Sequence, residues 1–161
     1  MRSEATDEAP MHHHEYHNAD FLTTLVDYYG FKSKGEFTKQ QLEDEILETA
    51  SHWVKRYESG HVIPYIQMHE FEALLFSDVS EFRWVLDGWN ETAEEKLKTI
   101  ARSFASPEEI NDNPESAPSK RILKIFKKGS YGKTEHGPII AQEIGLLKIR
   151  KVCPNFDAWL D

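Results

Sequence analysis

The sequence predicts an α/β fold: a parallel βαβ core followed by a mostly helical C-terminal half. Two short apolar runs, residues 21–26 and 61–67, have the length and β-branched content of buried strands. Between them, apolar residues recur at helical spacing over residues 38–57, and every pattern after residue 68 is helical. Because a long helix separates the two strands, we expect a right-handed crossover and parallel strands.

The first strand is a continuous apolar run that ends at Asp27. The helix that follows begins with a capping box, in which Thr38 is the N-cap and Gln41 stands three positions later. Gly60 is at the position expected for the helix to stop. The second strand contains Pro64, which removes a ladder donor and therefore predicts an edge position or a bulge.

Two strands alone make a marginal sheet, and parallel sheets normally contain more strands, covered on both faces. The sequence therefore predicts an incomplete sheet, whose missing strands come from sequence outside this chain or from a partner. Residues 1–18 are polar and rich in acids and histidines, which predicts a disordered tail. The predicted domain spans residues 19–161, with the helical part as its C-terminal extension.

Capping residues and prolines divide the C-terminal half into short helices. Thr92 begins a second capping box, and Ser106 followed by Pro107 is a strong helix start. Gly137 and Pro138 are predicted to open a helix that Gly145 ends. The remaining predicted helices cover residues 70–76, 79–86, 118–127, 146–152 and 155–160.

Composition excludes several classes of protein. No apolar run approaches the roughly 20 residues that span a bilayer, so no membrane association is expected. The single cysteine, Cys153, cannot form an internal disulfide and fits a reducing compartment, which predicts a cytoplasmic protein. Walker, dinucleotide-binding, zinc-finger and nucleophile-elbow motifs are absent from the sequence.

The charge of the chain is unevenly spread. The net charge is −9, yet residues 116–153 contain nine Lys and Arg against two acids. A local basic patch can steer phosphate chains toward an acidic protein. Within it, Lys120, Arg121 and Lys133 are the predicted contacts to a nucleic-acid backbone, because a helix start near residue 118 adds free N–H groups. The alternative is an ordinary solvated helix face.

Acidic side chains follow both predicted strands. Asp27 ends the first, while His69 and Glu70 lie just past the second and Glu72 follows. Ligands of parallel α/β sheets bind at the carboxyl ends of the strands, so Asp27 and Glu70 are expected to converge. Their oxygens suit Mg²⁺ or Mn²⁺, which activates water for phosphodiester hydrolysis. His69 is a predicted proton shuttle or a support for a ligand.

The same acids also have structural interpretations. Asp27 can cap a turn, and Glu70 and Glu72 can decorate a helix N-terminus, where the dipole favours acids. Because Glu70 and Glu72 are two positions apart, they would point in different directions on a helix. We therefore expect one of them to face the site.

Several strings resemble an uncharacterised bacterial family with a Toprim-like fold. They include Thr-Leu-Val-Asp-Tyr-Tyr-Gly at 24–30 and, above all, His-Glu-Phe-Glu-Ala-Leu-Leu-Phe at 69–76. Ala-Pro-Ser-Lys-Arg at 117–121 and Arg-Lys-Val-Cys-Pro-Asn-Phe at 150–156 extend the resemblance toward the C-terminus. Members of that family are often encoded beside AAA-type ATPases, in settings that suggest defence against phage.

The resemblance implies a Mg²⁺-dependent nuclease with an AAA-type ATPase as partner. The Toprim group includes topoisomerase, primase and nuclease domains, which use a glutamate after the first strand and acids after a later one. By this resemblance, Asp27 corresponds to the later-strand acid, and residues 69–72 to the acidic helix start of the nuclease branch. The family's opening strand and Glu-Gly turn have no counterpart in residues 1–18. A truncated, impaired enzyme is therefore expected.

Two hypotheses follow. In the first, Asp27 and Glu70 bind the metal, Glu72 is an accessory catalytic acid and His69 lies near the reacting phosphate. In the second, the chain is a non-catalytic module that docks on an ATPase through its helical half. Its basic stretch then only binds DNA or RNA.

Overall fold

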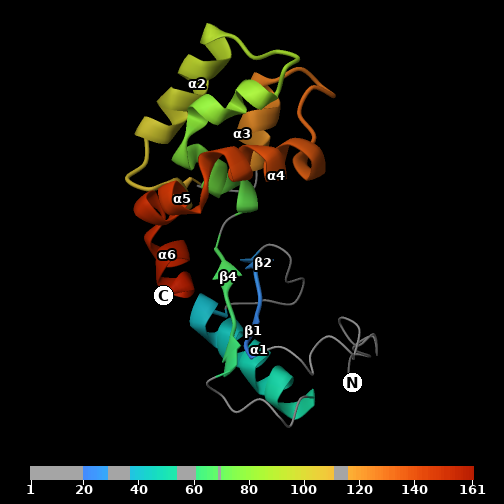
Figure 1. The fold of residues 1–161 in the computed structure, drawn as a ribbon, viewed down its shortest axis with the longest axis vertical. Helices are drawn as coiled ribbons and strands as arrows, with labels where there is room; N and C mark the ends of the chain where they lie inside the picture. The colour runs from blue at the N-terminus through green and yellow to red at the C-terminus, as the bar shows by residue number, and fades with distance from the viewer. Residues whose placement is uncertain (1–19, 29–36, 54–60, 69, 111–115) are drawn as a thin grey trace.

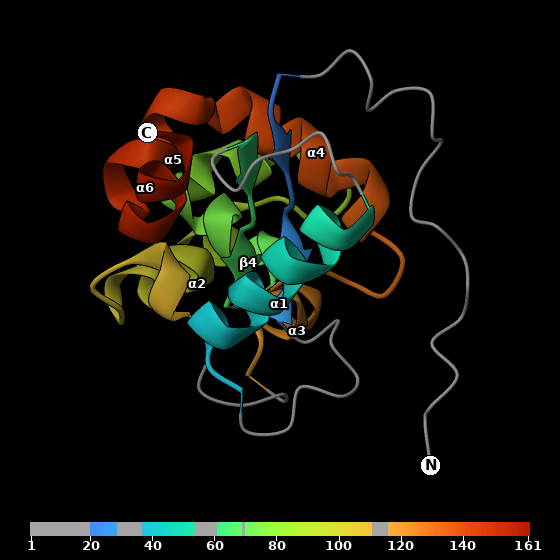
Figure 2. The same ribbon diagram turned by 90° about the horizontal axis from the view of Figure 1, so that it is seen from below.

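The computed structural model describes residues 20–28, 37–53, 61–68, 70–110 and 116–161. A small strand layer lies between helix α1 and a larger helical body, and the C-terminus lies beside the strands (Figure 1). Seen from below, α1 lies across the strands in front of the helical body (Figure 2). The predicted tail, residues 1–18, lies outside the described residues. No described helix is long and apolar enough to cross a membrane.

Each predicted strand is divided into two short segments. The first gives β1 (Leu22–Thr23) and β2 (Val26–Asp27), and the second gives β3 (Val62–Ile63) and β4 (Ile66–Gln67). β1 pairs with β3 and β2 with β4, both in parallel, as predicted. In this register Asp27 is the partner of Gln67. The carboxyl ends of β2 and β4 therefore lie side by side.

Pro64 explains why the ladder is interrupted. Proline has no N–H to donate, so the regular pairing stops beside it. The hydroxyl of Thr24 bridges the gap, because its Oγ1 accepts from the N–H of Tyr65 at 3.0 Å and donates to the Tyr65 carbonyl at 3.3 Å. Val26 N–H then donates to the same carbonyl at 3.3 Å and the ladder resumes.

Helix α1 (Lys39–Trp53) begins with the predicted capping box. Thr38 N–H donates to Gln41 Oε1 at 2.8 Å, and Gln41 N–H donates to Thr38 Oγ1 at 3.3 Å. Glu43 of the same helix accepts from the Ile66 N–H at 2.9 Å, which fixes α1 to β4. The predicted end of this helix lies outside the described residues.

The C-terminal half is helical, as predicted, but three of its helices have 3₁₀ geometry. These are η4 (Phe71–Ser77), η5 (Val79–Trp84) and η6 (Pro107–Glu109). The α-helices are α2 (Glu91–Arg102), α3 (Pro118–Ile125), α4 (Lys133–Ile144), α5 (Leu146–Val152) and α6 (Pro154–Leu160).

Two helix starts were wrong in the prediction. Asn90, rather than Thr92, caps α2, and its side chain accepts from the Ala93 N–H at 3.0 Å. Helix α4 begins at Lys133, so Pro138 lies inside it instead of opening it. The predicted end of that helix is confirmed, since Gly145 has a φ of 77°, a conformation that favours glycine.

The predicted end of α3 was also wrong, by two residues. Phe126 has an extended backbone and only 3% of its surface is exposed. Its ring stacks on those of Phe82 and Tyr131. Burying this ring takes the chain out of the helix, an example of tertiary packing overriding local propensity.

The hydrophobic core lies in the helical body rather than around the strands. Its fully buried side chains include Leu74, Leu75, Phe82, Leu97, Ile122 and Ile140. Helix α6 joins this body to the strands. Its Trp159 stacks on Tyr65 at a centroid distance of 4.7 Å and donates to Thr23 Oγ1 at 2.8 Å.

Candidate functional site

The structure brings the acids that follow the two strands together. Asp27, at the end of β2, accepts a hydrogen bond from the Phe71 N–H, with 3.1 Å between Oδ1 and N. Phe71 is the first residue of η4, so the chain leaving β4 folds back over Asp27. Glu70 directly precedes this contact, and Glu72 directly follows it. The segment that begins at Glu70 therefore lies at the sheet edge where Asp27 ends β2.

Glu70 connects three elements. It is the N-cap residue of η4, with an extended backbone at φ −64° and ψ 152°. Its Oε2 accepts from the Ser119 N–H at 2.9 Å, and its Oε1 lies 3.4 Å from the ammonium group of Lys133. Ser119 is the second residue of α3. The start of α3 was predicted as a phosphate contact. In the structure, its Ser119 N–H donates instead to the Glu70 carboxylate.

Glu72 reaches the same ammonium group. Its Oε1 lies 3.2 Å from Lys133 Nζ, and the side chain is only 7% exposed. The expectation that just one of Glu70 and Glu72 faces the site was wrong. It assumed that both residues are helical, whereas Glu70 is extended and precedes the helix. Lys133, the first residue of α4, therefore joins both carboxylates.

The surroundings shift the pKa values of Asp27 and Glu70 in opposite directions. Burial, together with the nearby charges of Glu72 and Glu70, raises the pKa of Asp27, against the hydrogen bond from Phe71 and the charge of Lys133. For Glu70, burial alone would raise the pKa. The hydrogen bonds from Ser119 and the charge of Lys133 outweigh it and hold the pKa of Glu70 below its ordinary value.

Tyr131 belongs to this site, although sequence analysis assigned no role to it. Its side chain is buried, and its hydroxyl has no hydrogen-bond partner within the described part of the chain. Burial first, then the charges of Glu72 and Glu70, raise the pKa of the phenol. A Cβ on Gly137 would lie 3.8 Å from this hydroxyl and 3.6 Å from the Phe71 ring. The position of Tyr131 in a glycine-punctuated loop, residues 131–133, was the available signal.

The donor set suits the predicted Mg²⁺ or Mn²⁺ in its chemistry. Asp27, Glu70 and Glu72 offer hard carboxylate oxygens, and burial together with the charges of Glu72 and Glu70 raises the pKa of Asp27. Among the described residues, no three acids, histidines or cysteines already stand as a set of metal ligands. His69, the predicted proton shuttle, lies outside the described residues.

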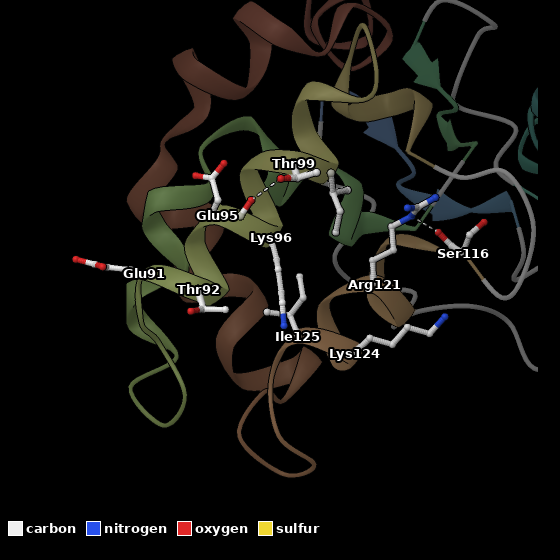
Figure 3. Close-up of a pocket in the computed structure, with 10 residues that line it drawn as sticks. Glu91, Thr92, Glu95, Lys96, Thr99, Ser116, Arg121, Lys124 and Ile125 are labelled. Atoms are coloured by element: carbon white, nitrogen blue, oxygen red, sulfur yellow. Dashed lines mark hydrogen bonds between the residues drawn. The ribbon is translucent and has the colours of Figure 1, made fainter.

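The predicted nucleic-acid contacts are distributed over two places. Lys120 is exposed on α3, and Lys133 is engaged by the acids. Arg121 lies in an open groove of about 790 Å³ between α2 and α3, where its Nε donates to the Ser116 carbonyl at 2.6 Å (Figure 3). Its guanidinium also covers the Phe104 ring at 5.3 Å. Lys96 and Lys124 line the same groove.

Comparison with known proteins assigns a family but no chemistry. A family model described as "Domain of unknown function (DUF4276)" matches residues 3–161. Neither the curated proteins nor the solved structures give a significant match. The Toprim-like relationship suggested by the motifs stays a prediction.

Proposed function

We propose that this protein, which belongs to the DUF4276 family, is a Toprim-like, Mg²⁺-dependent nuclease-type protein that acts on nucleic acid. The observation that best supports this proposal is the contact between Asp27, at the end of β2, and the start of η4, where Glu70 and Glu72 stand. Asp27 ends β2, while Glu70 and Glu72 flank the Phe71 N–H that binds the Asp27 carboxylate. Ligand sites of parallel α/β sheets lie at this edge.

Carboxylates that serve only the fold normally have their charge compensated. For Asp27, burial and the charges of Glu72 and Glu70 outweigh the hydrogen bond from Phe71 and the charge of Lys133, so the pKa of Asp27 is raised. Within the described residues, the Phe71 N–H is its only hydrogen-bond donor. Perturbed acids of this kind are more frequent at functional sites than elsewhere. The raised pKa and the single hydrogen-bond donor favour a ligand-binding role for Asp27 over the role of a simple turn cap.

In the proposed site, Asp27 and Glu70 hold a divalent cation and Glu72 assists them. Such a cation neutralises phosphate charge and lowers the pKa of bound water. Lys120 and Arg121 of α3 attract the phosphate chain, since both belong to the basic stretch 116–153. Helix α3 also provides Ser119, which orients Glu70. Ser119 therefore connects the acidic site directly to the basic helix α3.

The test is Mg²⁺-dependent nicking of supercoiled plasmid and cleavage of single-stranded RNA. We compare the wild type with Asp27→Asn and Glu70→Gln, which keep side-chain size while removing a charge. Lys98→Met is the matched control, because Lys98 pairs with Glu94 of the same helix, on the surface of α2. We expect weak cleavage, as for an impaired enzyme, by the wild type and the control and none by the two site variants. Equal cleavage by all four proteins would refute the assigned roles.

A second candidate function is a non-catalytic module that binds an ATPase partner. It is favoured by exposed leucines on the helical body, because Leu147 of α5 is 83% exposed and Leu86 is 84% exposed. We would co-express the chain with an AAA-type ATPase encoded beside it and measure co-elution. Loss of co-elution in Leu147→Glu, with no cleavage by the wild type, would favour this module over the nuclease.

A further inference from the structure

We infer that Lys133 is the resident cation of the acidic site, which a divalent cation must displace, so that Lys133 sets the metal affinity. This inference rests on the proposed metal-binding function and goes beyond it. It also gives Lys133 a different task from the phosphate contact that the sequence suggested.

The geometry places the ammonium group between two carboxylates. Lys133 Nζ lies 3.4 Å from Glu70 Oε1 and 3.2 Å from Glu72 Oε1. Both acids come from one short segment at the start of η4, whereas Lys133 comes from the start of α4. The lysine therefore bridges two elements and compensates charge where a metal ion is proposed to bind.

Exposure shows which partner is free to leave. The Lys133 side chain is 46% exposed, whereas that of Glu72 is only 7% exposed. Lysine carries its charge on a flexible chain, so Lys133 can turn into solvent and regain its hydration. Glu72 cannot do so, and a buried carboxylate without a counter-charge is strongly unfavourable. Departure of Lys133 consequently requires another cation in its place.

Tyr131 supplies an independent observation that this site accepts a further ligand. Its hydroxyl is a buried donor without a partner among the described residues, the residue is only 4% exposed, and the charges of Glu72 and Glu70 act on it. Unpaired buried polar groups are rare in folded proteins and need an explanation. Mg²⁺ usually retains water molecules, whose oxygens are the kind of acceptor that this hydroxyl lacks.

The experiment measures Mn²⁺ binding to the full chain by calorimetry and by electron paramagnetic resonance. The variants are Lys133→Met, Lys133→Gln and Lys133→Arg, with Lys98→Met as the control. Lys133→Gln keeps polar donors, so it serves if the methionine variant fails to fold. Removing one close positive charge should tighten Mn²⁺ binding about tenfold. Lys133→Arg and Lys98→Met should bind Mn²⁺ like the wild type.

The outcomes separate this inference from the function on which it rests. Mn²⁺ binding by the wild type, with equal or weaker binding by Lys133→Met and Lys133→Gln, would overturn the role of Lys133 and leave the metal site standing. Absence of Mn²⁺ binding in every variant would overturn both. Without metal, Lys133→Met should also unfold at a lower temperature than Lys98→Met, and Mn²⁺ should restore it. Equal unfolding temperatures would count against the resident-cation role.

Discussion

Glu70 is predicted to contribute to stability as well as to metal binding, and the two contributions can be measured separately. Glu70→Gln keeps an acceptor for the Ser119 N–H but removes the charge. Replacing a charge-assisted bond by a neutral one costs about 1 kcal/mol. Loss of the favourable charge at the start of α3 adds about 0.3–1 kcal/mol, and loss of the partly exposed pair with Lys133 adds between zero and about 1 kcal/mol.

The expected loss for Glu70→Gln is therefore about 1–3 kcal/mol in the free energy of unfolding. Glu70→Ala should cost about 2–4 kcal/mol, because the N–H of Ser119, a residue only 1% exposed, then has no acceptor. Urea unfolding, followed by the fluorescence of the four tryptophans in a metal-free buffer, measures both values. Glu91→Gln, which alters an exposed acid in the first turn of α2, is the control and should lose less than about 0.5 kcal/mol.

The pH dependence of the stability difference between wild type and Glu70→Gln tests whether the charge of Glu70 is responsible. The folded-state pKa of Glu70 lies below its ordinary value of 4.5, so its stabilising contribution is present above pH 4.5. That contribution disappears as the pH falls through the folded-state pKa. The difference between wild type and Glu70→Gln should therefore be full at pH 7 and vanish in acid. A difference that persists unchanged in acid, or no difference at pH 7, would refute this reasoning.

Three further predictions concern the surroundings of the site. Asp27→Asn should stabilise the fold at pH 7, with the gain vanishing below pH 3.8, because a raised folded-state pKa makes the charged form unfavourable; destabilisation at pH 7 would contradict this. Tyr131→Phe should raise the free energy of unfolding by about 1 kcal/mol, since the Tyr131 hydroxyl has no partner in the part of the chain that the structure describes. A lower free energy of unfolding, measured in urea, would reveal a partner. Glu108→Ala should lower the free energy of unfolding by about 2–4 kcal/mol in the same assay. The Glu108 carboxylate accepts from the Phe156 N–H at 2.8 Å and from the backbone and side-chain N–H groups of Asn155, at the start of α6. Unchanged stability would exclude a stabilising role for these bonds.

The sequence predicted local structure correctly where a feature depends on residues that are close together in the chain. The capping box at Thr38 and Gln41 is present as predicted, and Gly145 ends α4. These features depend on the backbone geometry of a few consecutive residues. The break in the ladder at Pro64 was equally foreseeable, because proline has no N–H wherever the chain places it. The hydroxyl of Thr24 that fills the gap was not foreseeable, because it comes from 41 positions away.

The acidic site shows the same division. The order of strand, helix and strand, with acids after both strands, predicted that Asp27 and the segment beginning at Glu70 lie at one sheet edge, since parallel strands end there. Only the tertiary structure decided the partners of those acids. The helical body brings Ser119 from 49 positions away and Lys133 from 63 positions away to Glu70. No periodicity encodes such encounters, because they depend on how α3 and α4 pack on η4 rather than on any local preference.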